Sequence, residues 1–186
     1  NCLIANNSNS VAGTVADGVQ IRTGSDLRLN NSTVAYNAEQ GIYCNPGDNS
    51  KCYVSDSIVW GHTVTNIQAQ LLATCVYSCV QGDFTNAGAG PGVISNNPVF
   101  TDTYYYHVKS SAGYYAGGWV SGGSWQTTES NSPCIDAGDP AGAFQPEPFY
   151  NGGRANIGAY GGTAVASLSP AFTNFFVKQD GNDLAD

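Results

Sequence analysis

Ser32-Thr33-Val34-Ala35-Tyr36-Asn37 decides the fold of this chain, because its small-x-Val pattern recurs along the sequence. The other copies are Cys2-Leu3-Ile4-Ala5-Asn6-Asn7, Ser57-Ile58-Val59-Trp60-Gly61-His62 and Ser78-Cys79-Val80-Gln81-Gly82. Aligning the copies places Ile4, Val34, Val59 and Val80 in one column, at steps of 30, 25 and 21 residues. Steps of this size are typical of the turns of a solenoid.

Two further sets of segments keep similar steps. Leu27 and Leu29 align with Cys52 and Val54, and then with Ala73 and Cys75. Between these runs lies a third segment, which occurs as Gly18-Val19-Gln20-Ile21, as Gly41-Ile42-Tyr43-Cys44 and, more loosely, as Val64-Thr65-Asn66-Ile67. Each turn therefore has three short alternating runs separated by Gly, Asn, Asp and Ser corners.

This pattern predicts an all-β fold, a right-handed parallel β-helix. One turn of such a coil cannot bury its own inward side chains, so turns stacked at ~4.8 Å complete both the hydrogen-bond ladder and the core. An antiparallel β-sandwich with coincidental spacing is the alternative. We expect β-helix turns over residues 1–100, an aromatic and glycine-rich C-terminal cap over 101–166, and a linker, apolar strand and polar tail over 167–186. Because the repeat is already under way at Cys2, we expect a processed product or a fragment.

The apolar strand near the C-terminus needs a partner, because an isolated strand of this composition would expose apolar surface. It is expected either to fold back on its own coil or to add to a neighbouring chain. The candidate assembly residues are Phe172, Phe175, Phe176 and Val177.

Charge and composition limit the partners. Only 11% of the residues are charged, the formal net charge is −8 and the six basic residues are scattered. This argues against nucleic acid and anionic membranes and favours a neutral polymer or a cation. No apolar run is long enough to span a bilayer, so no membrane insertion is expected. Abundant Gly and Tyr with no Met are typical of an extracellular or cell-surface β protein.

The even number of cysteines predicts an oxidising compartment. Cys44 and Cys52 flank a turn-rich loop and are the first expected disulfide. Cys79 falls in the outward column of Ile58 and is expected to pair with Cys134. Two buried thiols, Cys2 and Cys75, would remain.

Several motifs occur in order near the C-terminus: Tyr77-Ser78-Cys79-Val80-Gln81-Gly82, Asn97-Pro98-Val99-Phe100, Tyr106-His107-Val108, Ser132-Pro133-Cys134-Ile135-Asp136-Ala137-Gly138-Asp139-Pro140 and Asn151-Gly152-Gly153-Arg154-Ala155-Asn156-Ile157-Gly158-Ala159-Tyr160-Gly161-Gly162-Thr163. Together they resemble the C-terminal end of secreted bacterial right-handed parallel β-helix proteins of the pectate-lyase-like superfold. The resemblance covers roughly residues 75–166 and implies the fold and secretion more than a chemistry.

Pectate-lyase-like enzymes use a Lys or Arg base, usually with calcium held by carboxylates. The corresponding residue types here are Arg28 and Lys51, with Asp26, Asp48 and Asp56 nearby, but they do not complete that constellation. In the terminal motifs, Asp136 and Asp139 are expected to accept backbone N–H groups and Arg154 to pair with one of them, making a lid on the last turn. A paired-carboxylate active site is the alternative.

The favoured function is a non-catalytic extracellular or cell-surface module with a structural or adhesive role, self-associating end to end into filaments. The first alternative is carbohydrate binding through exposed rings, for which the candidates are Tyr105, Tyr114, Tyr115, Trp119 and Trp125. The second is a fragment of a polysaccharide lyase or glycoside hydrolase. The expected partners are therefore the chain itself, a polysaccharide, or both.

The sequence predicts few modification sites and no metal site. Asn6, Asn30 and Asn31 stand in N-x-[ST] contexts and are candidate glycosylation sites. No catalytic residue, metal site or cofactor is predicted. Calcium is the one alternative, since Asp180-Gly181-Asn182-Asp183 has part of a calcium-loop composition without its spacing.

Overall fold

The computed structural model describes residues 1–8, 16–45, 47, 49–69, 74–82, 88–149 and 151–170. Within these residues all regular structure is β, with no helix. The strands are β1 (Leu3–Ala5), β2 (Val19–Ile21), β3 (Asp26–Asn30), β4 (Thr33–Ala35), β5 (Gln40–Cys44), β6 (Lys51–Ser55), β7 (Ile58–Trp60), β8 (Thr65–Ala69), β9 (Thr74–Val76), β10 (Cys79–Val80), β11 (Gly88–Ala89), β12 (Tyr114–Gly118) and β13 (Gly122–Gln126). The predicted assembly strand, Phe172 to Val177, lies outside the described residues.

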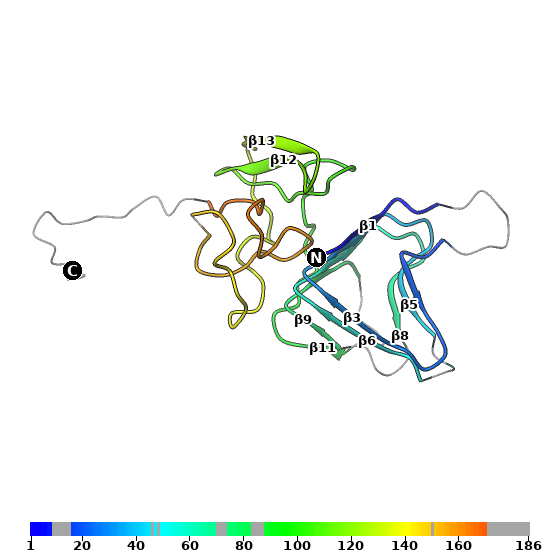
Figure 1. The fold of residues 1–186 in the computed structure, drawn as a ribbon. Helices are drawn as coiled ribbons and strands as arrows, with labels where there is room; N and C mark the ends of the chain where they lie inside the picture. The colour runs from blue at the N-terminus through cyan, green and yellow to red at the C-terminus, as the bar shows by residue number, and fades with distance from the viewer. Residues whose placement is uncertain are drawn as a thin grey trace, which may run out of the picture.

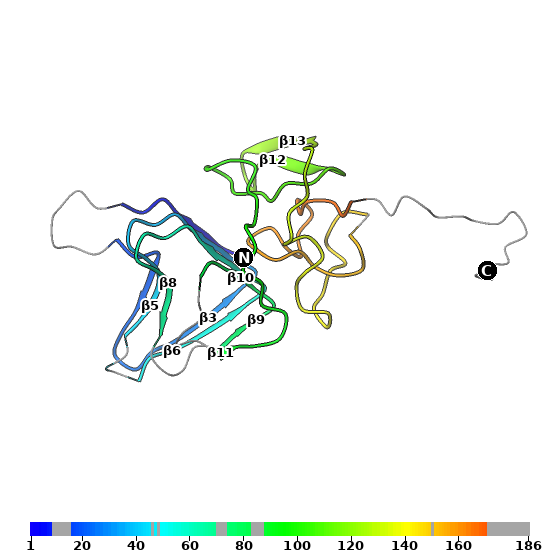
Figure 2. The same ribbon diagram turned by 180° about the vertical axis from the view of Figure 1, so that it is seen from behind.

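The first eleven strands form three parallel sheets, which we call the three-sheet body. The first sheet has the order β1-β4-β7-β10, the second β2-β5-β8 and the third β3-β6-β9-β11. From β1 to β10 the chain therefore visits the first, second and third sheets in turn and then begins again, and β11 joins the third sheet. In Figures 1 and 2 these sheets form the sides of a triangle.

The strand register confirms the predicted columns. Ile4 lies beside Val34, Val34 beside Val59 and Val59 beside Val80 in the first sheet. In the third sheet, Leu29, Val54 and Cys75 are neighbours in the same way. All the strand pairs of the three-sheet body are parallel, which rules out the antiparallel sandwich for this part of the chain.

One alignment in the second sheet needs a correction. Ile42 pairs with Ile67, and Gln40 with Thr65. The third copy of this segment therefore keeps the 25-residue step and is displaced by two residues from the looser sequence alignment. The register follows burial, because a displacement by two keeps Ile67 on the inner face beside Ile42.

Serine residues form a ladder at the corner before the first sheet. Ser32, Ser57 and Ser78 are buried. Each hydroxyl accepts a backbone N–H from the preceding turn, at 3.2 Å from Cys2, 3.1 Å from Ser32 and 3.1 Å from Ser57. Each hydroxyl also donates to the carbonyl two residues earlier. A small hydroxyl side chain thus satisfies buried backbone groups at the corner where the chain enters the first sheet.

A second ladder lies at the corner that follows the first sheet. The Asn7 N–H donates to Asn37 Oδ1 at 3.0 Å, and the Asn37 N–H donates to His62 Nδ1 at 3.1 Å. His62 Nε2 lies 3.1 Å from the Val34 carbonyl, so the proton is on Nε2. His62 is therefore a corner residue, as the column of Asn7 and Asn37 predicts.

The cap packs against the flank of the three-sheet body, on the outer face of the first sheet. The Ala159 N–H donates to Thr33 Oγ1 at 3.0 Å, and the Asn1 side chain donates to the carbonyls of Ala159 and Gly161. Gly158 has φ +111, and a Cβ there would lie 2.8 Å from Ile58 Cδ1. The predicted lid on the last turn is thus wrong, because the cap lies beside the triangle of sheets (Figure 1).

None of the six cysteines, all of which are described, forms a disulfide. Cys44 and Cys52 point into the interior, where they occupy the columns of Ile21 and Leu27. Cys79 and Cys134 do share one buried cluster between the first sheet and the cap, where contact with Cys134 and burial raise the pKa of Cys79. Cys75 is buried as predicted, whereas Cys2 is exposed.

Candidate functional site

The hairpin of β12 and β13 carries most of the candidate aromatic residues. Its strands are antiparallel, with Tyr115 opposite Trp125 and Gly117 opposite Gly123. The turn between them ends at Gly122, whose φ of +67 requires glycine, and a Cβ at Gly117 would collide with the Gly122 carbonyl. The glycine-rich sequence is therefore explained by a tight turn and a close backbone approach. Figure 1 shows the hairpin on the outside of the cap.

A continuous chain of rings runs beneath the hairpin. Trp125 contacts Tyr115 with centroids 5.7 Å apart, and Tyr115 contacts His107 at 6.3 Å. His107 stacks on Tyr160 at 3.5 Å, and Tyr160 contacts Trp119 at 4.9 Å. His107 and Tyr160 are buried, while Trp119 and Trp125 are each 46% exposed. Two half-exposed indoles are thus held by a buried aromatic base.

Hydrogen bonds fix this base. His107 Nε2 lies 2.8 Å from the Gly117 carbonyl, so it carries the ring proton and ties the ring to the middle of the hairpin. Burial lowers the pKa of His107 to about 4, which keeps the imidazole neutral at neutral pH. The Tyr160 hydroxyl donates to the Tyr105 carbonyl at 2.7 Å, and burial raises the pKa of Tyr160.

The other two predicted rings are arranged differently. The Tyr105 hydroxyl accepts a hydrogen bond from Ser121 in the hairpin turn at 3.3 Å, which places Tyr105 at the same end as Trp119. Tyr114 lies on the opposite face of the hairpin from Tyr115, and its hydroxyl donates to Gln126 Oε1 at 3.1 Å. We call Tyr105, Tyr115, Trp119 and Trp125 the aromatic hairpin surface.

Sequence reasoning missed His107 and Tyr160, whose burial under the hairpin has no local periodic signal.

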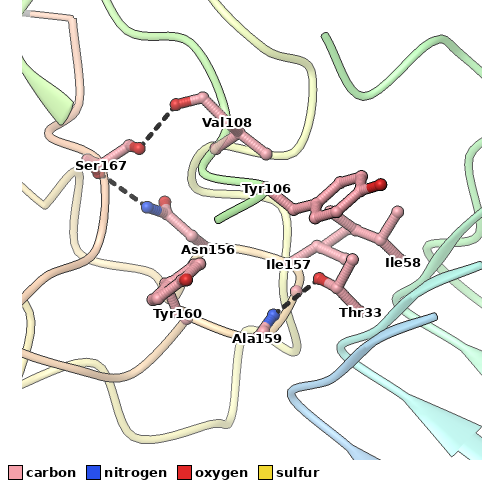
Figure 3. Close-up of a pocket in the computed structure, with 11 residues that line it drawn as sticks. Thr33, Ile58, Tyr106, Val108, Asn156, Ile157, Ala159, Tyr160 and Ser167 are labelled. Atoms are coloured by element: carbon pink, nitrogen blue, oxygen red, sulfur yellow. Dashed lines mark hydrogen bonds between the residues drawn. The ribbon is translucent and has the colours of Figure 1, made fainter. Parts of the chain in front are cut away.

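A small cavity between the cap and the first sheet is not a ligand site. It has room for about one water molecule. Its polar lining is paired within the protein: Ser167 Oγ donates to the Val108 carbonyl, and Asn156 Nδ2 to the Ser167 carbonyl, both at 2.7 Å (Figure 3). The cavity is a packing detail of the joint between the cap and the three-sheet body.

The terminal carboxylates have mainly structural contacts. Asp139 Oδ1 accepts the Ala141 N–H at 2.9 Å, as predicted. Asp136, however, accepts the Ser169 hydroxyl at 2.8 Å and no backbone N–H within the described residues. Arg154 donates to the carbonyls of Ala137 and Gly138, so its predicted pairing with an Asp is wrong. These carbonyls are the acceptors that the tight turn at 136–139 leaves open.

Glu147 is a buried carboxylate that sequence reasoning missed. It is 5% exposed, and its Oε1 accepts the N–H groups of Asn156 at 2.8 Å and Gly162 at 2.7 Å. Its Oε2 is buried and has no hydrogen-bond partner among the described residues. Burial, together with the nearby Asp136 charge, raises the pKa of Glu147 to about 7. The segment Gln145-Pro146-Glu147-Pro148 has no alternation that predicts burial.

The residues considered for lyase chemistry are dispersed. Arg28 lies over the Tyr53 ring at 4.3 Å on the third sheet, where Asp26 is next to Lys51. Asp56 faces the cap instead, and its Oδ1 accepts the Asp139 N–H at 2.6 Å. Within the described residues no three metal-binding side chains are grouped. Asp48 and the segment 180–183 lie outside those residues.

Two of the candidate glycosylation sites make side-chain contacts. Asn6 donates to the Thr103 carbonyl and accepts the Tyr106 hydroxyl at 2.7 Å. Asn30 Oδ1 accepts the Ser55 hydroxyl at 2.8 Å. Modification of Asn6, Asn30 and Asn31 stays a prediction.

No family model, curated protein or solved structure matches this chain. The resemblance of residues 75–166 to the pectate-lyase-like proteins therefore stays a prediction. No helix in the described part of the chain is long and apolar enough to cross a membrane.

Proposed function

We propose that the three-sheet body is a right-handed parallel β-helix and that the protein is a non-catalytic, extracellular adhesive module that binds polysaccharide. The repeated order of the sheets and the register of the valine column support the coil. Parallel crossover connections are right-handed in nearly all proteins, which supports the hand. The low charge and the high Gly and Tyr content support an extracellular location.

The observation that carries the adhesive function is that the two indoles are partly exposed and yet held in place by other rings. Trp119 and Trp125 are each 46% exposed, although each contacts another aromatic ring. A large ring that is already ordered loses little conformational entropy when a ligand packs on it. Flat indole faces of this kind pack well against the apolar faces of sugar rings.

Replacing Trp119 or Trp125 with Ala is expected to weaken polysaccharide binding by roughly tenfold each, because each change removes one stacking face. Binding is measured by retention on insoluble polysaccharides and by affinity electrophoresis. The matched control is Tyr43→Ala, which removes a half-buried ring from the outer face of β5 in the second sheet, away from the hairpin. Equal retention of the two Trp variants and the control would contradict the proposal.

A second function, self-association into filaments, is favoured by the edge of the three-sheet body. Among the described residues, β1, β2 and β3 each pair on one side only. The inward side chains on this edge, Ile4, Val19 and Leu27, are only partly buried. An open strand edge beside apolar side chains is a template for pairing with another chain.

Electron micrographs and sedimentation at several concentrations test this second function, with filaments or larger species expected for the wild type. Leu27→Lys is expected to reduce association because it places a charge on the apolar part of the edge. Gln20→Lys, which adds the same charge at an exposed side chain of the edge, is the control. Dispersed monomers at all concentrations would contradict self-association.

A further inference from the structure

We infer that the aromatic hairpin surface takes an uncharged, extended, β-linked polysaccharide rather than an acidic one. This inference rests on the proposed polysaccharide-binding function and names the class of polymer. It is carried by the charge of the surface, by its hydroxyl groups and by the positions of the two indoles along the hairpin.

The segment that builds the surface is almost without charge. Between Thr103 and Thr128 the only charged side chain is Lys109, since His107 is neutral. The backbone of Lys109 is hydrogen-bonded to Val99 and Ser132, so Lys109 lies in a segment outside the hairpin. Acidic polymers are bound through Arg and Lys side chains, which this surface does not offer. The net charge of −8 would also repel a polyanion.

The side-chain hydrogen-bonding groups of the aromatic hairpin surface are hydroxyls. The turn carries the Ser121 and Tyr105 hydroxyls, beside Trp119. Ser124, Gln126 and Tyr114 lie on the opposite face of the hairpin from Trp125 and do not belong to this surface. A hydroxyl group both donates and accepts hydrogen bonds, which suits the hydroxyl groups of a neutral sugar.

The two indoles are attached at different points along the hairpin. Trp119 is in the turn, and Trp125 is three residues along β13 from Gly122, which places its Cα ~10 Å from the end of the turn. An extended β-linked chain that lies along the hairpin therefore passes both points at which the indoles are attached. Sugars linked in this way present apolar ring faces along the chain, so two successive stacking contacts are available. Longer oligosaccharides should therefore bind better than a monosaccharide.

The test compares the wild-type protein on a soluble neutral β-1,4-glucan and on polygalacturonate, by affinity electrophoresis and calorimetry at low and high salt. We expect the glucan to bind at least roughly tenfold tighter, with little dependence on salt. Among glucan oligosaccharides, affinity should rise from one unit to about four, and Trp119→Ala should abolish the gain beyond two. Thermal unfolding of each variant confirms that it is folded.

The outcomes separate the two proposals. Tighter, salt-dependent binding to polygalacturonate that is lost in Trp119→Ala and Trp125→Ala would overturn the inference about charge and leave the adhesive function standing. Affinity that is the same for one unit and for four would overturn the extended-chain inference. Retention of neither class of polymer would overturn the adhesive function itself.

Discussion

Replacing Ile58 with Ala is expected to lower the free energy of unfolding by about 2–4 kcal/mol. Ile58 is 1% exposed and lies on the outer face of the first sheet. It packs in a cluster with Cys134 and Ile157 of the cap. The substitution leaves a cavity at the joint between the three-sheet body and the cap. Urea denaturation followed by tryptophan fluorescence measures the loss, because all but one of the Trp residues are in the cap.

The control for Ile58→Ala is Val64→Ala, which shortens an aliphatic side chain that is 62% exposed. Surface changes of this kind usually alter stability by less than about 0.5 kcal/mol. A similarly small effect at Ile58 would mean that the cap is not packed on the first sheet. An early fluorescence transition confined to Ile58→Ala would show that the cap separates before the sheets unfold.

The sheets could be predicted from the sequence because each turn repeats the same chemistry. Val34 and Val59 are neighbours in space for the reason that aligns them in sequence: inward positions of stacked turns meet the same surroundings. The cap has no such repeat. Its contact between Ala159 and Thr33 joins residues more than one hundred positions apart, and no column marks the pair. The order of the motifs alone therefore did not show whether the cap packs on the side of the three-sheet body or on its last turn.

The cysteines show where a local sequence pattern predicted a disulfide that does not form. The loop between Cys44 and Cys52 suggests a disulfide, but alternation places both thiols in interior columns beside Ile21 and Leu27. There a thiol acts as a small apolar side chain, and burial raises the pKa of Cys52 to about 12. The proximity of Cys79 and Cys134 was predicted from the outward column, whereas their bond was not formed.

The aromatic site was predictable in its composition and not in its arrangement. Exposed Trp119 and Trp125 follow from a glycine-rich, aromatic segment with few aliphatic neighbours. Their support by His107 and Tyr160 depends on a contact between segments some fifty residues apart. Stacking of this kind is a tertiary property, which neither alternation nor spacing encodes.

Glu147→Gln is expected to remove much of the pH dependence of stability between about pH 4.5 and pH 7. The folded pKa of about 7 is above the unfolded value of 4.5. The wild type is therefore fully stabilised by this group below pH 4.5, and it loses that stabilisation as the pH rises through 7, by on the order of 3 kcal/mol. Glutamine keeps an oxygen for the N–H groups of Asn156 and Gly162 and carries no charge.

At pH 8 the Glu147→Gln variant should thus be more stable than the wild type, while at pH 4.5 the two should be nearly equal. Free energies from urea denaturation at half-unit pH steps give both curves, and Glu129→Gln, at an exposed position, is the control. Burial also raises the pKa values of Asp56 and Asp136. The stability of the wild type and of Glu147→Gln should therefore change with pH in a similar way at lower pH. Parallel curves for wild type and Glu147→Gln across pH 5–8 would show that the carboxylate is ionised and solvated in the folded protein. In that case Glu147 would not hold the 156–162 segment as a buried acceptor.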